Sequence, residues 1–158
     1  AVLARSLSVR RRILAVLAGG FCGAVIRYIL STLIQGLLGK SWPYDILLIN
    51  ITGALILAFV TILADATFLI GPTRRLFINV GFLGAYTTFS SLALGDVLLF
   101  ANQWLPALLY LVISAIGGAL AVILGDWLGQ WFISKARHTS VHAATISRTT
   151  KKIPTLPF

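Results

Sequence analysis

The chain has 158 residues, of which 58% are hydrophobic and only 11% are charged. A soluble domain of this size carries about 25% charged residues, so this composition excludes an ordinary soluble protein and indicates a membrane protein. The net charge of +9 does not indicate nucleic-acid binding. The basic residues stand almost wholly outside the apolar runs, as they do in loops beside lipid headgroups.

Four apolar runs are each long enough to cross a bilayer as a helix, which takes about 20 residues. The connections between them are short, and Pro43 and Pro106 suit helix starts. We therefore predict an all-α membrane protein with a four-helix transmembrane domain. It follows a basic N-terminal segment, 1–12, and precedes a basic, flexible C-terminal tail, 133–158. Within the domain of residues 13–132, the helices are expected at 13–38, 46–64, 76–99 and 105–132.

Basic residues are distributed unevenly between the two ends of such an arrangement. With four spans, both termini and the connection between the second and third spans share one side of the membrane. That side holds eleven Lys and Arg residues, and the other side holds only Lys40. Since loops rich in Lys and Arg stay in the cytoplasm, we expect a multi-pass protein of the plasma membrane with both termini cytoplasmic. The eleven residues are Arg5, Arg10, Arg11, Arg12, Arg74, Arg75, Lys135, Arg137, Arg148, Lys151 and Lys152.

Polar and ionisable groups inside the runs are functional candidates, because they are expensive in a bilayer. The chain has no Glu, and its four Asp lie at run ends, so it lacks the midplane carboxylate that a proton-coupled transporter usually needs. Arg27 interrupts the first run, which we interpret as a retained span rather than a signal peptide. Arg27 can attract an anion into a vestibule, or pair with a helix C-terminus or a cluster of carbonyls, and the two roles do not exclude each other. Asn50 either faces a pathway, where its amide replaces part of an anion's hydration shell, or bonds to another helix.

The third run is unusually rich in Gly and hydroxyl residues. Residues 81–91 read GFLGAYTTFSS, which favours a helix broken mid-membrane, with close packing through small residues as the alternative. Freed backbone groups are tolerated there only when buried in protein or lining a cavity. Freed carbonyls can bind cations, and freed amides and hydroxyls can bind anions. In the fourth run, Tyr110 and Ser114 share one helix face, as part of a polar track or of a packing seam.

Taken together, these segments resemble the Fluc (CrcB) family of fluoride channels over residues 19–118. The most specific match is Gly81-Phe82-Leu83-Gly84 followed by Thr87-Thr88-Phe89-Ser90. The resemblance implies an antiparallel, dual-topology dimer with two pathways through which fluoride leaves the cell passively. The remaining matches are Gly19-Gly20, Gly23-Ala24, Arg27-Tyr28, Pro43, Asn50 and Gly53.

The resemblance also assigns roles to particular residues. It implies a structural sodium ion at the dimer centre, held by the backbone carbonyls of Gly84 and Thr87, and it places Arg27 at a vestibule. An aromatic ring has a positive edge, so Phe89 can meet an anion edge-on while amide and hydroxyl donors replace its water. The residues implied for the anion pathway are Asn50, Phe89, Tyr110, Ser114, Thr88 and Ser90.

Two positions depart from the family's pattern. The second phenylalanine, three residues after the first, is here Leu92, and the Gly-Thr pair that follows the proline is here Asp45-Ile46. Asp45 either adds a negative charge near a pathway mouth or caps the helix. Leu92 and the uneven charge favour the hypothesis that the chain is a non-conducting or half-active subunit, paired with a homologous subunit of opposite orientation. The alternative partner is a second copy of the chain.

Other classes of protein fit less well. A small multidrug exporter also has four spans but needs a carboxylate in the first, and none stands there. A non-transporting scaffold subunit would not need polar residues within its spans. An enzyme is not expected, because no nucleophile–base pair or metal-ligand cluster is evident. His138 and His142 lie in the tail. The expected partners are therefore fluoride, sodium, lipid and a second subunit.

Overall fold

The computed structural model describes residues 2–66 and 70–151, and every regular element in these ranges is a helix. Within them, four helical segments are long and apolar enough to cross a membrane: Ser8–Leu38, Tyr44–Ala66, Pro72–Asn102 and Trp104–Ala136. This confirms the predicted class, an all-α protein with four potential transmembrane helices.

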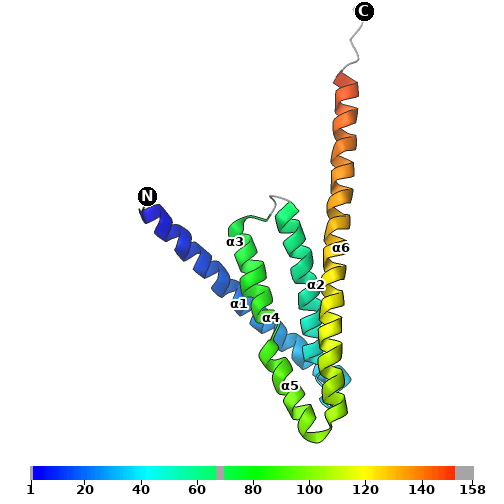
Figure 1. Ribbon diagram of the computed structural model, residues 1–158. Helices are drawn as coiled ribbons and strands as arrows, with labels where there is room; N and C mark the ends of the chain where they lie inside the picture. The colour runs from blue at the N-terminus through cyan, green and yellow to red at the C-terminus, as the bar shows by residue number, and fades with distance from the viewer. Residues whose placement is uncertain (1, 67–69, 152–158) are drawn as a thin grey trace, which may run out of the picture.

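The first two spans form a helical hairpin, α1 (Val2–Leu38) and α2 (Tyr44–Ala66). α1 ends at Leu38 and is followed by Gly39, whose positive φ of 82° suits a residue without Cβ. The Gly39 N–H donates to the carbonyl of Gln35 at 3.0 Å and closes the last turn. Figure 1 shows that this hairpin turn lies at the end of the bundle opposite the N-terminus.

The third span is not one continuous α-helix. It consists of α3 (Pro72–Arg75), the π-helix η1 (Leu76–Leu83), α4 (Gly84–Tyr86) and α5 (Phe89–Asn102). It thus begins before and ends after the predicted range of 76–99. Thr87 and Thr88 are extended, with ψ values of 154° and 117°. This interruption falls inside the segment for which the sequence favours a broken helix.

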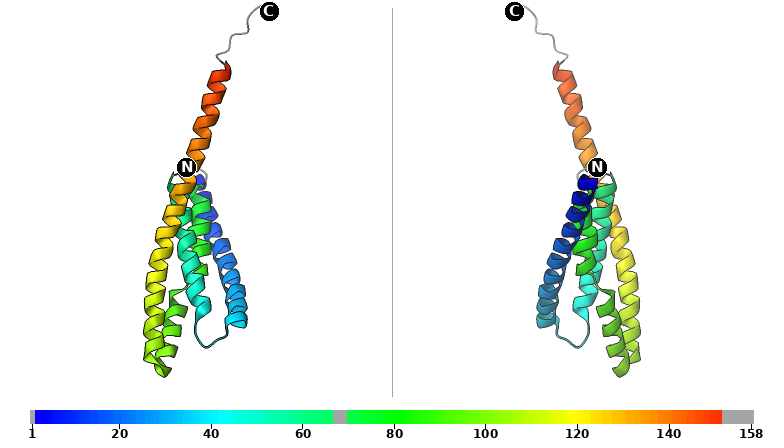
Figure 2. Two further views of the ribbon diagram at one scale, coloured as in Figure 1. Left: turned by 90° about the vertical axis from the view of Figure 1, so that its right-hand side faces the viewer. Right: turned by 90° about the vertical axis from the view of Figure 1, so that its left-hand side faces the viewer.

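The fourth span is the straight helix α6 (Trp104–Lys151), which follows α5 after the extended residue Gln103. α6 runs back along α2, and its C-terminal part extends beyond the rest of the bundle (Figures 1 and 2). The helices therefore continue past the predicted span limits, since α1 already begins at Val2 and α6 reaches Lys151. Hydropathy marks the apolar part of a helix and not where the helix ends.

Small residues allow the backbones of neighbouring spans to approach closely, as in many membrane proteins. A Cβ added to Gly23 of α1 would lie 2.2 Å from the carbonyl oxygen of Phe82 in η1. A Cβ on Gly125 of α6 would lie 2.3 Å from the carbonyl oxygen of Leu55 in α2. The fourth-span glycine nearest to Ser114 also belongs to a packing seam, because Gly117 faces Ile51 of α2.

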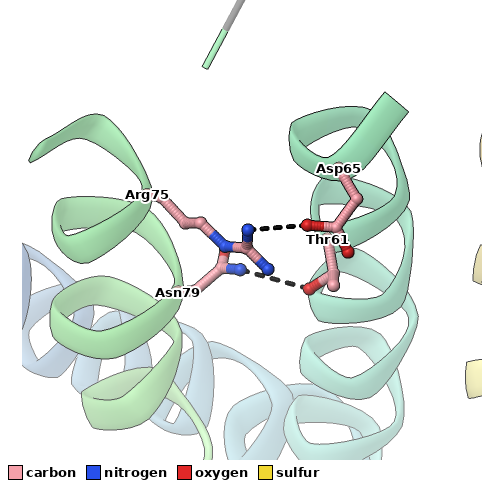
Figure 3. Close-up of polar contacts among 4 residues, drawn as sticks. All are labelled: Thr61, Asp65, Arg75 and Asn79. Carbon is pink, nitrogen blue, oxygen red and sulfur yellow. Dashed lines mark hydrogen bonds and ion pairs between the residues drawn. The ribbon is translucent and has the colours of Figure 1, made fainter. Parts of the chain in front are cut away.

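Two polar contacts join α2 to the third span at the end where the N-terminus lies (Figure 3). Arg75 Nη1 lies 2.6 Å from Asp65 Oδ1, and one turn further along, Asn79 Nδ2 donates to Thr61 Oγ1 at 3.1 Å. The ion pair is exposed, so it contributes little to stability. The inner contact lies deeper and fixes the register of η1 against α2.

A single subunit buries little of its apolar surface. The fully buried cluster is small and centres on Ile49, Leu83 and Tyr86. Large side chains point outward along the spans, including Phe21 at 72% exposure and Phe100 at 66%. Such a surface suits lipid or another protein chain rather than water.

Candidate functional site

The centre of the third span is shaped by Thr87 and Thr88. Thr87 still closes the preceding helix, because its N–H and its Oγ1 both donate to the Leu83 carbonyl, at 3.0 and 2.9 Å. Thr88 opens α5, since its Oγ1 accepts from the N–H of Ser91 at 3.2 Å, a typical N-cap. Sequential threonines thus end one helix and start the next inside the span.

Asn50 of α2 supplies the hydrogen bonds that the break removes. Its Nδ2 donates to the Thr88 carbonyl at 3.0 Å, and its Oδ1 accepts from the Thr88 N–H at 2.8 Å. Both backbone groups of an extended residue are therefore satisfied by one side chain, as a membrane interior requires. Of the two interpretations left open by the sequence, a bond to another helix is what the structure shows. One amide hydrogen of Asn50 remains for a ligand.

Hydroxyl groups gather beside this contact. Thr88 Oγ1 lies 3.1 Å from the hydroxyl of Ser90 and donates to that of Ser91 at 3.1 Å. Thr88 is buried, whereas Ser90 is exposed. On the other side, Thr52 Oγ1 and the Tyr86 hydroxyl lie 2.9 Å apart. The structure therefore brings together Asn50, Thr88 and Ser90 of the predicted pathway. It adds Tyr86, which the residue pattern did not single out.

The break also frees two carbonyls. In an unbroken helix the N–H of Thr88 would donate to the Gly84 carbonyl, and that of Ser91 to the Thr87 carbonyl. Here the first N–H donates to Asn50 and the second to the Thr88 hydroxyl. Gly84 is exposed. Backbone oxygens without helical donors are fitting ligands for a hard monovalent cation. The predicted pair of sodium ligands therefore fits the local hydrogen bonding.

Tyr110 and Ser114 lie on α6, beside α5. Tyr110 is fully buried, its ring meets Trp42 edge-on at 5.3 Å, and it faces Gly95. Yet its hydroxyl, the Ser114 hydroxyl and Oδ1 of Asp96 are buried without a hydrogen-bond partner among the described residues. Buried polar atoms normally have partners. These three groups therefore keep hydrogen-bonding capacity that no described residue uses.

Phe89 and Leu92 take different positions on α5. Phe89 is 81% exposed and opens the helix immediately after the break. Leu92 is half-buried. The Phe89 ring is therefore hardly covered by the rest of the chain and lies on the surface of the bundle.

A cleft of about 470 Å³, lined by both polar and apolar side chains, includes residues of the α1–α2 turn. Asp45 lies in its wall, 5% exposed, and accepts from the side chains of Ser31 and Gln35 of α1, the latter at 2.8 Å. Asp45 thus lies in the first turn of α2 and is bonded to side chains of α1 in the cleft wall, rather than capping α2. Arg27 is not one of the lining residues, which are Ser31, Gln35, Lys40, Ser41, Trp42, Pro43, Asp45, Ile46, Ser91, Leu94, Gly95, Leu98, Leu99 and Asn102.

The residues of this cleft were mostly missed by sequence reasoning. Ser31 and Gln35 stand four residues apart near the end of the first apolar run, a spacing that places both on one helix face. This spacing is the feature of the sequence from which a polar face at this end of the first span could have been predicted. Lys40, from which the sequence indicated only the orientation of the chain, also lines this cleft.

The fold and this site define a small four-helix membrane protein with a polar, interrupted third span, an arrangement suited to ion passage. Residues 14–126 match the family described as CrcB-like protein, Camphor Resistance (CrcB). The chain belongs to this family, which confirms the resemblance noted in the sequence. An enzymatic role finds no support in this membership.

Proteins with a curated description are similar over most of both chains. The chain is 37% identical to "Fluoride-specific ion channel FluC" of Chloroflexus aurantiacus over 121 residues, 76% of this chain and 96% of that one. It is 38% identical to the protein of the same name from Nitratidesulfovibrio vulgaris over 120 residues, 75% and 97% of the two chains. The protein of that name from Trichormus variabilis is 43% identical over 122 residues, 76% and 89% of the two chains.

Proposed function

We propose that the chain forms a fluoride-selective ion channel that lets fluoride leave the cell passively and so relieves fluoride toxicity. Family membership supports the transported ion. The observation that carries the proposal is the Asn50–Thr88 contact, which holds hydroxyls and a free amide hydrogen together inside a span. Fluoride is small and strongly hydrated, and such donors can replace its water.

The proposed pathway uses residues from three spans. Asn50, Thr88 and Ser90 act beside the break, and Tyr110 and Ser114 offer hydroxyls that have no partner among the described residues. Phe89 is exposed and would present its ring edge to the ion from one subunit to the next. The vestibule role of Arg27, a half-buried residue of α1, stays part of the proposal.

We further propose an antiparallel dimer, with a sodium ion held at its centre by the carbonyls of Gly84 and Thr87. Support comes from the exposed Gly84 and from the N–H groups that bond elsewhere. When bound, sodium would neutralise these carbonyls and supply a fixed positive charge near the pathways. The partner is a second copy or a homologous subunit of opposite orientation.

The distribution of basic residues favours a homologous subunit of opposite orientation over a second copy of the chain. Eleven basic residues belong to the side of the termini and only Lys40 to the other, so each copy should insert with its termini in the cytoplasm. A chain fixed in this way cannot form an antiparallel dimer with itself in a cell. The candidate alternative function is therefore a half-active subunit of a heterodimeric channel.

The test is fluoride efflux from liposomes that contain the purified chain alone, read with a fluoride electrode, with chloride efflux as the control. Rapid, fluoride-selective efflux supports a homodimeric channel. If the folded protein alone gives no efflux, it is reconstituted together with a homologous subunit of opposite orientation and fluoride efflux is measured again. Restored efflux supports the heterodimer, and continued absence of flux contradicts channel function.

A further inference from the structure

The cleft at the α1–α2 turn contains one acid and one base. Among its lining residues, Asp45 is the only carboxylate and Lys40 the only cation. Lys40 is exposed on the turn, whereas Asp45 is buried in the cleft wall. The two charges therefore differ in depth, with the positive one at the surface and the negative one further in.

The position of Asp45 is fixed by two donors. Ser31 Oγ and Gln35 Nε2 both donate to its Oδ2, and Gln35 Nε2 also donates to Ser31 Oγ at 3.1 Å. Both donors belong to α1, so the carboxylate is tied across the hairpin. Asp45 Oδ1 takes no part in these bonds. A fixed charge acts on a passing ion more strongly than a mobile one, because it does not move away.

The inner wall of the cleft meets the break in the third span. Ser91 lines the cleft and accepts a hydrogen bond from Thr88 Oγ1 at 3.1 Å. The backbone of Thr88 is in turn bonded to Asn50. The wall thus runs from Lys40 at the turn, past Asp45, to the residues of the proposed pathway.

We propose that this cleft is the entrance to the pathway on the side of the α1–α2 turn, and that Asp45 limits the rate at which anions pass it. Lys40 acts in the opposite direction and attracts them. The inference rests on the proposed function, since it concerns the ion that the channel carries.

The expected size of the effect follows from Coulomb's law. A unit charge about 8 Å from an anion changes the local anion concentration about twofold at the dielectric constant of water, and about thirtyfold at a value of 20. Asp45→Asn should therefore raise the initial rate of fluoride efflux about threefold or more. Lys40→Gln should lower it about twofold, because Lys40 is exposed to water. Asparagine retains an oxygen that can accept from Ser31 and Gln35, so the hairpin should be preserved.

The experiment compares these variants with the wild type in liposomes, at matched amounts of folded protein. Asp45→Glu keeps the charge and should keep the wild-type rate. Asp126→Asn removes the same charge from α6, where Asp126 bonds Gln130 and does not line the cleft. It is the matched control and should leave the rate unchanged. A second measurement repeats the series in an impermeant salt at about 0.05 M and about 1 M, because salt screens charge effects and not structural ones.

A faster Asp45→Asn variant whose advantage shrinks in high salt supports the proposal. An equal rate for wild type and Asp45→Asn, with the wild type conducting, would overturn the role of Asp45 and leave the proposed function intact. If neither the wild type nor any variant conducts, alone or with a homologous subunit, both inferences fail. If Asp45→Asn does not fold, Lys40→Gln on the exposed turn still tests the proposal. An unchanged rate of fluoride efflux in Lys40→Gln would contradict the claim that charges in this cleft control the entry of anions.

Discussion

Asn50 and Thr88 are joined by a pair of hydrogen bonds, at 3.0 Å from the amide to the carbonyl and 2.8 Å from the backbone N–H to the amide oxygen. The pair bridges 38 positions of the chain. It ties the second span to the middle of the third. It also takes the Thr88 N–H away from the carbonyl of Gly84, so one side chain both stabilises the break and frees a possible sodium ligand.

Asn50→Ala should therefore destabilise the protein as well as stop conduction. The substitution leaves the buried N–H and C=O of Thr88 without partners, and each such group costs about 1–3 kcal/mol. We expect the free energy of unfolding to fall by about 2–6 kcal/mol, and fluoride efflux to fall at least about tenfold. Denaturant unfolding in detergent and liposome efflux measure the two effects.

The control for this variant is Gln130→Ala. Gln130 is exposed on α6 and donates to Asp126 of its own helix, at 2.8 Å. Its loss should change stability by less than about 0.5 kcal/mol. If Asn50→Ala were as stable as this control, the pair with Thr88 would not be holding the spans together.

Gly23 and Gly36 of α1 offer a matched test of the close packing between α1 and η1. A Cβ on Gly23 would lie 2.2 Å from the Phe82 carbonyl oxygen, while nothing lies within 4 Å of a Cβ on Gly36. Gly23→Ala must push two backbones apart, which should cost about 1–3 kcal/mol. Gly36→Ala should be neutral or gain about 0.5–1 kcal/mol from helix propensity. Equal thermal stabilities would show that the two helices can separate without penalty.

The sequence predicted the spans well because apolar runs of sufficient length are a local property. The composition of residues 81–91 also favoured a broken helix, through its Gly and hydroxyl residues. It did not show that the break lies at Thr87 and Thr88, because that position depends on a partner in another span. The sequence leaves two interpretations of Asn50 open for the same reason, because its hydrogen-bond partner lies in another span.

The residues around the cleft were harder to predict from the sequence than the break in the third span. Arg27 stood out because it is a charge inside an apolar run, yet hydropathy does not say which way a side chain points. Asp45 stood out as a departure from the family pattern, but its partners Ser31 and Gln35 meet it only when the α1–α2 hairpin forms. Lys40 is a single cation on a short turn, and the structure was needed to show that it lines the cleft.

Tyr110→Phe separates a pathway role from a packing role. The Tyr110 hydroxyl is buried without a partner among the described residues, so its removal breaks no hydrogen bond that the structure shows. The ring would keep its contact with Trp42. We expect thermal stability to be unchanged or slightly higher, while fluoride efflux falls by about tenfold, because a donor to the ion is lost. A variant that conducts like the wild type would remove Tyr110 from the pathway.

Sodium should stabilise the assembled protein in a way that depends on Asn50. A ligand that binds only the folded state raises stability by about 2.7 kcal/mol at a hundred times its dissociation constant. The melting temperature should therefore fall when sodium is replaced by N-methyl-D-glucamine at equal ionic strength. In Asn50→Ala the Thr88 backbone is no longer held in the conformation that frees the Gly84 carbonyl, so the sodium dependence should shrink, while Tyr110→Phe should retain it. A wild-type melting temperature that does not respond to sodium would contradict a site formed by the Gly84 and Thr87 carbonyls.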